Sequence, residues 1–371
     1  MTFHISRDRL RRDPAPSGQP NHGSRGSPDQ EQRQNHFQRE RQPHDQGPKD
    51  DPPSGPHSQA YPAPPRHQAW NPTNSFPGCI AVEDNADRSE VSDIEPQLPT
   101  PGDDRPSLRV WINGRLCDAA DPVLEADNPG WLVGWGVFET LLGRDGRPCF
   151  LDRHLRRLAG GAARLGVGPV PDVGTLEPAL RRLMVENGLE RGLSRLRITA
   201  VPGTVLVTAT ALSPYPATAA VVTSPFVRNE RDALAGIKAT SYAGNLVALR
   251  EARERGADEA ILANTRGELC EGATSNLFLV RRDGCLITPP LASGCLPGVM
   301  REVVLERCRE RGIEVREESG PPADLATCRE AFLTSSLRGV QGIVRIDERE
   351  LPAPGEVTLR LRQVPGLAPS A

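Results

Sequence analysis

The sequence contains almost no lysine. Of its 45 lysine and arginine residues, only Lys49 and Lys238 are lysines. Arginine stays protonated in proteins, whereas a desolvated lysine amine can lose its proton and act as a nucleophile, for example to form a Schiff base. Lys49 lies in a polar, proline-rich segment, but Lys238 lies in the apolar, helix-leading stretch AGIKATSYAGNLVALREA at residues 235–252. A chance placement stays open on this evidence alone, and Lys238 becomes the candidate nucleophile.

Histidine, paired cysteine and long apolar runs are also scarce. Six of the seven histidines precede residue 106, so a histidine-rich metal site is excluded from the core, and a Ser–His or Cys–His nucleophile would depend on His154 alone. None of the eight cysteines forms a CxxC pair, and no secretory signal is recognisable, which predicts reduced thiols in the cytoplasm. No run approaches the ~20 apolar residues that a membrane span needs, which predicts no membrane association.

Residues 1–105 lack periodic apolar residues. They hold 17 of the 37 prolines and are rich in Gln, Asp, Asn, Ser and Gly. Such a segment cannot bury enough surface to offset its chain entropy, which predicts a disordered tail over 1–105. A start codon assigned too far upstream would explain the segment equally well. The net charge of −3, with arginines interleaved with acids, argues against a nucleic-acid partner.

Periodic apolar segments begin near Ser107 and continue to about Leu361, enough for a large core. Over 107–218 we expect a strand at SLRVWING, a helix capped by Asp152, a helix over 176–189, and strands at RLRITAV, VLVTATA and AAVVTSP. A linker is expected at 213–218 or 228–233, and a second set of strands and helices comes after it. The pattern predicts an α+β chain with domains at 106–220 and 221–371.

Three segments carry groups that suit an anion. LPGVM opens a helix, where the amides of Val299 and Met300 would be unpaired. LTSS ends a strand with the hydroxyl of Ser336, and in HLRRL one of Arg156 and Arg157 should face inward. Each segment also has an ordinary explanation, as a helix start, a turn or an exposed pair. Together they indicate a phosphate site.

Two further residues suit an aromatic nitrogen heterocycle. Glu271 precedes a small-residue turn into a buried strand, and a carboxylate beside a pyridine nitrogen keeps that nitrogen protonated. Tyr242, four residues after Lys238, is placed to bond a ring hydroxyl. Capping of the turn by Glu271 and interior packing of Tyr242 remain open alternatives. With the lysine and the phosphate groups, these residues favour a ligand with a carbonyl, a phosphate and a ring nitrogen.

Seven segments, in this order, resemble the class IV aminotransferases, which are fold-type IV enzymes that use pyridoxal 5′-phosphate. The segments are GVFETLL, FLDRHLRRL, RLRITAVPG, IKATSYAGNLVALREA, CEGATSNLFLV, TPPLASGCLPGVMREVV and AFLTSS. The resemblance covers about residues 108–345. It implies a smaller N-terminal α/β domain, a larger barrel-like C-terminal domain, a cofactor between them, and a homodimer.

The resemblance also implies roles for individual residues. Lys238 would form the Schiff base with pyridoxal 5′-phosphate and move the substrate proton, and Glu271 would pair with the ring nitrogen. The other implied positions are Arg157, Val299, Met300 and Ser336 at the phosphate, Leu296 against the ring, Tyr242 in the cofactor loop, and Arg197 near the substrate.

The family contains branched-chain and D-amino-acid aminotransferases and 4-amino-4-deoxychorismate lyases. This chain has Val133-Gly134-Trp135-Gly136 where the family often has Tyr-Gly-Asp-Gly, so Trp135 would reshape the substrate site. It lacks the histidine of the Arg-x-His clamp of the D-amino-acid enzymes, and its N-terminal motifs are most similar to those of the lyases. We expect amino-group transfer or aminodeoxychorismate lysis on a small-molecule amino donor. A branched-chain or D-amino-acid enzyme, and a catalytically silent scaffold, remain alternatives.

Overall fold

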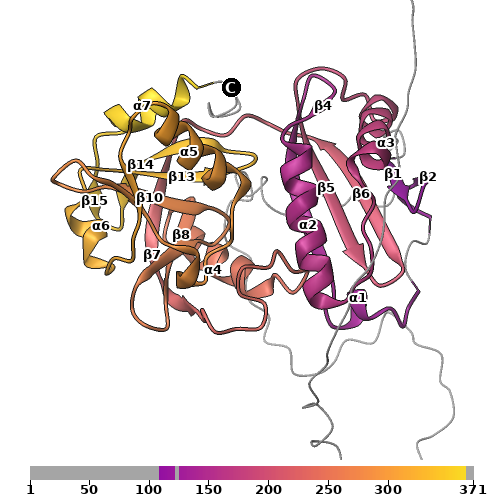
Figure 1. Cartoon of the computed structure of the whole chain (residues 1–371), viewed down its shortest axis with the longest axis horizontal. Coiled ribbons are helices and arrows are strands. Elements are labelled where there is room, and N and C mark those ends of the chain that lie inside the picture. The colour runs from indigo at the N-terminus through magenta and orange to yellow at the C-terminus, as the bar shows by residue number, and fades with distance from the viewer. Residues whose placement is uncertain (1–107, 122–124, 365–371) are drawn as a thin grey trace, which may run out of the picture. The chain divides into compact units, whose positions relative to one another are not determined.

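The structure is a computed structural model that describes residues 108–121 and 125–364 (Figure 1). All of these residues belong to one unit, Asp93–Ala371. The predicted disordered tail, residues 1–105, lies outside the described residues. Within the two described ranges, no helix is long and apolar enough to cross a membrane.

The first half of the described chain forms a six-stranded antiparallel sheet in the order β2-β1-β6-β5-β3-β4. Buried and more exposed side chains alternate along its strands, because successive side chains of a strand point to opposite faces and only one face of this sheet is covered by helices. In the central strand β5, for example, Leu196 and Ile198 are fully buried, while Arg195 and Arg197 point to the other face. The strands are β1 (Arg109–Ile112), β2 (Arg115–Asp118), β3 (Val137–Arg144), β4 (Arg147–Pro148), β5 (Leu193–Val201) and β6 (Thr204–Ala211).

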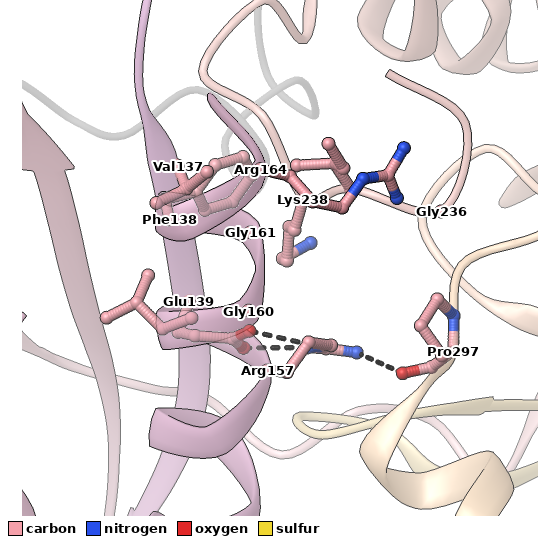
Figure 2. A pocket seen from close by; sticks show the side chains of 12 residues that line it. Val137, Phe138, Glu139, Arg157, Gly160, Gly161, Arg164, Gly236, Lys238 and Pro297 are labelled. Carbon is pink, nitrogen blue, oxygen red and sulfur yellow. Dashed lines mark hydrogen bonds and ion pairs between the residues drawn. The ribbon is translucent and has the colours of Figure 1, made fainter. Parts of the chain in front are cut away.

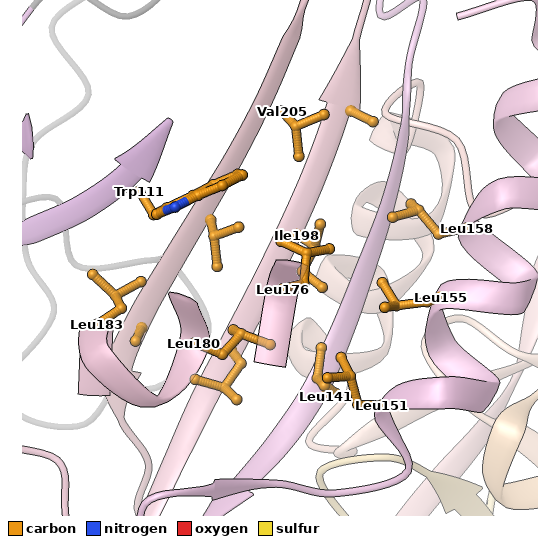
Figure 3. Packing of buried hydrophobic residues seen from close by; sticks show 14 of the residues in the cluster. Trp111, Leu141, Leu151, Leu155, Leu158, Leu176, Leu180, Leu183, Ile198 and Val205 are labelled. Atoms are coloured by element: carbon orange, nitrogen blue, oxygen red, sulfur yellow. The ribbon is translucent and has the colours of Figure 1, made fainter. Parts of the chain in front are cut away.

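Two helices cover one face of this sheet, α2 (Leu151–Leu165) and α3 (Val173–Glu186), and a short α1 (Pro129–Leu132) precedes β3. Figure 3 shows Leu155 and Leu158 of α2 and Leu180 of α3 packed around Ile198. The prediction that Asp152 caps α2 is wrong. Phe150 is the N-cap, with a φ of 52° and no side-chain cap, because the tight turn after β4 leaves Asp152 inside the first helical turn.

The second half forms a nine-stranded mixed sheet in the order β12-β11-β10-β13-β14-β7-β8-β9, with β15 paired to β14. The parallel pairs are β7 with β8, β7 with β14, and β11 with β12. The strands are β7 (Thr218–Arg228), β8 (Glu259–Asn264), β9 (Leu269–Gly272), β10 (Asn276–Val280), β11 (Leu286–Thr288), β12 (Val315–Glu317), β13 (Glu330–Ser335), β14 (Gly339–Ile346) and β15 (Arg349–Glu350).

The sequence AAVVTSP belongs to β7 of the second sheet, so the prediction that it joins the strands of the first unit is wrong. Val221 and Val222 are neighbours in the chain and are both buried, so this part of β7 is covered on both faces. Two-sided burial is typical of a parallel strand inside a sheet. The two partners of β7, the strands β8 and β14, are distant from it in sequence, and a local sequence pattern does not reveal which strands will pair.

Helices cover the second sheet as well. The helix α4 (Ala243–Glu254) buries Ala248 and Leu249 against β7 and β8. The helix α5 (Val299–Glu310) turns Val299, Val303 and Cys308 inward, as predicted. The remaining elements are η1 (Leu291–Ser293), α6 (Ala323–Thr327) and α7 (Glu356–Arg362). The prediction of an α/β fold is confirmed.

Candidate active site

Lys238 lies where the second half of the chain meets the first sheet. The backbone N–H of Phe138 donates to the carbonyl of Lys238 at 2.9 Å, and the N–H of Thr240 donates to Gly136 at 2.9 Å. An isolated bridge between Val137 and Ala239 completes the pairing. The segment around Lys238 thus extends the edge of β3, which fixes the backbone of the candidate nucleophile.

The amine of Lys238 has no hydrogen bond or ion pair with any residue that the structure describes. Its Nζ lies 4.4 Å from the centroid of the Phe138 ring and 5.0 Å from that of Tyr242. It faces a cavity of about 250 Å³ whose walls include Glu139 and Arg157 (Figure 2). Burial, together with the nearby charge of Arg157, lowers the pKa of Lys238 to about 8. The amine of Lys238 is therefore buried, unpaired among the described residues and of lowered pKa, and it stays the candidate nucleophile.

This low pKa predicts that Lys238 destabilises the cofactor-free protein near neutral pH. The folded-state pKa of about 8 lies below the ordinary 10.5, so the unfolded chain binds more protons between these values. Stability therefore rises with pH from about 8 to 10.5, and the full cost of burying the ammonium is present below pH 8. We expect Lys238→Met to raise the free energy of unfolding at pH 7 by on the order of 1–3 kcal/mol.

Urea unfolding of the cofactor-free protein at pH 7 and pH 10 measures this effect. The gain from Lys238→Met should shrink towards pH 10.5, and Lys49→Met should change nothing. A variant that loses stability at pH 7, or that gains equally at both pH values, contradicts the prediction.

Arg157 forms a bidentate ion pair with Glu139. Its Nε donates to Glu139 Oε1 at 2.7 Å, its Nη2 donates to Oε2 at 2.6 Å, and its Nη1 donates to the carbonyl of Pro297 at 2.9 Å (Figure 2). A guanidinium has five N–H donors, so two remain for a ligand. Of the pair Arg156 and Arg157, Arg157 faces inward, while Arg156 is exposed and pairs with Asp152.

Glu139 also anchors His154. The carboxylate is completely buried, and its Oε2 lies 2.7 Å from His154 Nδ1. Burial alone would raise the pKa of Glu139, but the charge of Arg157, with its hydrogen bonds, lowers it to about 2. Burial lowers the pKa of His154. Glu139 is therefore anionic at neutral pH and holds two basic side chains of α2 in place.

His154 Nε2 lies 3.1 Å from Ser336 Oγ, which places serine, histidine and glutamate in the order of a nucleophile, base and acid. The space beside Ser336 and His154 is only about 30 Å³, room for about a single water. Glu139 is also engaged by Arg157. This arrangement has no room for an acyl substrate. We therefore interpret Glu139 and His154 as residues that hold Arg157 and Ser336 in place.

Sequence reasoning missed the role of Glu139, and it considered His154 only as a possible nucleophile partner. A signal was present, because Glu139 is the only charged residue in the apolar stretch GVFETLL. Its significance depends on its partners in α2, and a strand pattern does not identify them.

The N-terminus of α5 lies beside Arg157. Gly298 is its N-cap, with Val299 and Met300 as the first helical residues. Asn276 Nδ2 donates to the carbonyl of Leu296 at 2.9 Å, and a Cβ on Gly298 would collide with Asn276 Oδ1. Glycine is required here so that the chain can pass Asn276 and enter the helix. Met300 also lines the small space beside Ser336, so the predicted phosphate groups converge.

Glu271 is buried at the end of β9. Its Oε2 accepts from the backbone N–H of Leu296 at 2.8 Å, and its Oε1 lies 3.1 Å from Arg228 Nε. Burial raises the pKa of Glu271, and both Arg228 and the Leu296 amide oppose this rise. Arg228 is a second residue that the sequence did not reveal.

Tyr242 is tied to the turn that follows Glu271. Its hydroxyl donates to the carbonyl of Ala273 at 3.1 Å, and its ring packs edge-on to Phe138 with centroids 5.2 Å apart. Burial raises its pKa, so the phenol is neutral. Tyr242 therefore lies between Lys238 and the Glu271 turn.

The two residues predicted near the substrate, Arg197 and Trp135, do not line the cavity that Lys238 faces. Arg197 stacks on Phe138, with its guanidinium carbon 3.8 Å from the ring centroid. Trp135 is 47% exposed and follows the exposed residues Trp131, Leu132 and Val133. The structure brings Arg197 next to the lysine through Phe138, and it leaves Trp135 at the surface.

Comparisons with known proteins agree with this geometry. The family model "Amino-transferase class IV" matches residues 136–346. A putative branched-chain-amino-acid aminotransferase from Methanocaldococcus jannaschii is 30% identical over 69% of this chain and 94% of its own. A bifunctional aminodeoxychorismate lyase and D-amino acid transaminase from Mycobacterium tuberculosis is 31% identical over 66% and 92%.

A solved structure shows the same fold. A hypothetical aminotransferase from Mycobacterium tuberculosis in its PLP-bound form has a TM-score of 0.58 and 30% identity over 66% of this chain and 93% of its own. The family model covers more than half of the sequence, and the solved structure shares the fold. The chain belongs to the class IV aminotransferase family.

Proposed function

We propose that this protein is a pyridoxal-phosphate-dependent enzyme that acts on a small amino donor, by amino-group transfer or by lysis of an aminodeoxychorismate-type substrate. The observation that carries this proposal is the state of the Lys238 amine. It faces a cavity, has no hydrogen-bonding partner among the described residues, and has a lowered pKa. An amine kept unpaired in a buried position is costly to the fold and suits bond formation with a carbonyl.

Two residues that line the cavity, and the buried Glu271, fit pyridoxal 5′-phosphate in three separate respects. Lys238 suits its aldehyde, the two remaining N–H groups of Arg157 suit its phosphate, and the buried Glu271 suits its ring nitrogen. When bound, the cofactor supplies a protonated ring that accepts the electrons released at the substrate carbon.

The phosphate would be held from several elements. We assign this role to Arg157 of α2, to the backbone N–H groups of Val299 and Met300, and to the hydroxyl of Ser336. Unpaired N–H groups and the helix dipole favour an anion at the start of α5. Leu296 would pack against the ring, and its backbone N–H already orients the Glu271 carboxylate at 2.8 Å.

Lys238 would also move the substrate proton. A pKa of about 8 leaves a substantial neutral fraction near neutral pH, which suits a general base. Tyr242 would orient the ring through a hydrogen bond to its hydroxyl. Glu271, positioned by Arg228 and the Leu296 amide, would pair with the ring nitrogen.

Transfer and lysis share this proton abstraction and differ in the later steps, and the relatives include named enzymes of both kinds. We assign the choice between the two outcomes to the substrate-side residues Arg197 and Trp135, and a branched-chain or D-amino-acid aminotransferase is the alternative assignment. The retained low-pKa Lys238 speaks against a silent scaffold.

Cofactor titration with covalent trapping tests the proposal. Purified protein is titrated with pyridoxal phosphate while visible absorbance is recorded, then reduced with borohydride and mapped by peptide mass spectrometry. We expect a visible absorbance band for protein with bound cofactor, saturating at about one cofactor per chain, and label on Lys238. Lys49, the only other lysine, is the internal control. Label on Lys49 alone, or no band, rejects the assignment.

We also propose that the protein is a homodimer in the cytoplasm. Trp131, Leu132, Val133 and Trp135 form a run of exposed large apolar side chains, which supports an interface with a second copy. The seven cysteines within the described ranges are all free thiols, which supports a reducing compartment. Sedimentation of the purified protein measures the first point, since a monomer at micromolar concentration rejects it.

A further inference from the structure

An ion pair joins α2 of the first half of the chain to α5 of the second. Arg153, in the first turn of α2, donates from Nη1 to Glu306 Oε1 at 2.9 Å and from Nη2 to Glu306 Oε2 at 2.8 Å. Its Nη1 also lies 3.1 Å from Glu302 Oε2. One guanidinium therefore holds two carboxylates that lie about one turn apart on α5. All three side chains are partly exposed, that of Arg153 at 23%.

Arg153 lies on the same face of α2 as Arg157, because the two are four residues apart in one helix. Arg157 also reaches the second half, through its hydrogen bond to the carbonyl of Pro297 just before α5. Phe150, at the N-cap of α2, packs against the apolar cluster that contains Met300 of α5. The first two turns of α2 are therefore fastened along α5 at several points.

The groups that we assign to the cofactor phosphate come from both of these helices. Arg157 belongs to α2, and the backbone N–H groups of Val299 and Met300 belong to the start of α5. Hydrogen bonds weaken steeply as their geometry departs from the optimum, so these groups can bind one phosphate together only while the two helices keep their separation. The Nη atoms of Arg153 are engaged by carboxylates of α5, so this side chain holds the helices and leaves the phosphate to Arg157.

Glu302 places a negative charge near the same site. It lies in the first turn of α5, and its backbone N–H donates to the carbonyl of the N-cap residue Gly298 at 2.9 Å. A carboxylate at this position repels a phosphate at the start of the helix. The guanidinium of Arg153 offsets that charge, and its hydrogen bonds lower the pKa of Glu306, which keeps this partner anionic.

We propose that Arg153 is a positioning residue for the cofactor phosphate, which holds α2 against α5 and offsets the charge of Glu302, so that its contribution to cofactor affinity depends on ionic strength. This inference rests on the proposed function for the identity of the ligand. Salt screens partly exposed ion pairs, with a Debye length of about 10 Å at 0.1 M and about 3 Å at 1 M. High salt therefore weakens the ion pair, while the apolar contacts of Phe150 persist.

Two ligands that differ only in the phosphate test the proposal, pyridoxal phosphate and pyridoxal. Their affinities are measured by absorbance titration at about 0.05 M and about 1 M sodium chloride. At low salt we expect Arg153→Met to weaken pyridoxal phosphate about 5-fold and to leave pyridoxal within about 2-fold, since an exposed ion pair contributes up to about this much. At high salt the 5-fold difference should shrink to within about 2-fold. Equal weakening of both ligands, or an unchanged affinity for pyridoxal phosphate, overturns the proposal.

Charge exchange distinguishes the ion pair from the bulk of the Arg153 side chain. Arg153→Glu should weaken pyridoxal phosphate more than Arg153→Met does, and adding Glu306→Arg should restore part of the affinity, because the pair is then rebuilt in reverse. Arg153→Lys should keep part of the affinity, since it retains the charge without the planar fork. Arg156→Met is the matched control, because Arg156 is exposed and pairs within α2 with Asp152. It should change neither affinity by more than about 2-fold. A double variant no better than Arg153→Glu, with unchanged thermal unfolding, also overturns the proposal.

Inorganic phosphate separates this inference from the proposed function. Calorimetry with the cofactor-free protein measures its affinity, which Arg153→Met should also weaken about 5-fold. If no cofactor band forms but phosphate binds with this difference, the cofactor assignment fails and the role of Arg153 stands. If the band forms and the variant binds phosphate and pyridoxal phosphate as the unmodified protein does, the cofactor assignment stands and the role of Arg153 is rejected.

Discussion

Replacing Lys238 with arginine is expected to abolish turnover while the protein stays folded. General-base catalysis alone contributes about 10²–10⁴-fold to a rate, and here the same amine would also bond to the cofactor. We therefore expect kcat to fall by at least about 10³-fold. Amino-donor turnover is measured together with circular dichroism and thermal unfolding.

Arginine is the informative replacement because it keeps the charge and the stacking on Phe138 and Tyr242. It stays protonated, so it supplies neither a nucleophile nor a base. The matched control is Lys49→Arg, which changes the only other lysine and should leave kcat within about 2-fold, since single surface changes are usually near neutral. Full activity in Lys238→Arg would exclude the proposed chemistry.

Replacing Arg157 with methionine is expected to have the largest effect on stability. The variant leaves the buried carboxylate of Glu139 with only His154 as a partner, and breaking a buried ion pair in this way costs about 3–5 kcal/mol. Pyridoxal phosphate should also bind at least about 10-fold more weakly, because a charged hydrogen-bond donor to the phosphate is lost. Urea unfolding of the cofactor-free protein and an absorbance titration measure the two effects.

The same ion pair makes stability depend on pH. The folded-state pKa of Glu139, about 2, lies below its ordinary value of 4.5, so the contribution of the carboxylate is present above pH 4.5 and is lost as the pH falls towards 2. In Arg157→Met the pKa should rise, because burial then dominates, and this acid-dependent loss should disappear.

A second substitution distinguishes the charge from the packing of Arg157. Glu139→Gln removes the unpaired anion, so the double variant with Arg157→Met should regain part of the stability but none of the cofactor affinity. Arg156→Met, at the neighbouring exposed position of α2, should cost less than about 0.5 kcal/mol. A loss below about 1 kcal/mol in Arg157→Met would show that the ion pair does not stabilise the fold.

Much of this site could be predicted from the sequence because its signals are local. Helical periodicity required one of Arg156 and Arg157 to face inward, and Pro297-Gly298 marked the start of α5. Lysine scarcity singled out Lys238 without any knowledge of the fold. The first two features depend on residues that lie within one or two helical turns of each other, and the third depends on the composition of the whole chain.

The missed features depend on residues that are far apart in the chain. Arg228 meets Glu271 only because β7 joins the second sheet. Glu139 acquires its role from Arg157 and His154, which a separate helix supplies. The error over β7 has the same origin, since an apolar strand pattern does not say which sheet it enters. The cap of α2 was misplaced because Phe150 adopts a left-handed turn that aromatic residues seldom take.

The pairing of the Lys238 segment with β3 has a consequence for assembly. Lys238 comes after β7 of the second sheet in sequence, yet the backbone of its segment is hydrogen-bonded to the first sheet. Arg157 likewise reaches across 140 positions of sequence to the carbonyl of Pro297. The candidate site therefore forms only when the two halves of the chain have docked. Any ligand that spans Arg157, Lys238 and α5 would bind that docked form alone, so occupancy and docking are linked equilibria, each of which strengthens the other.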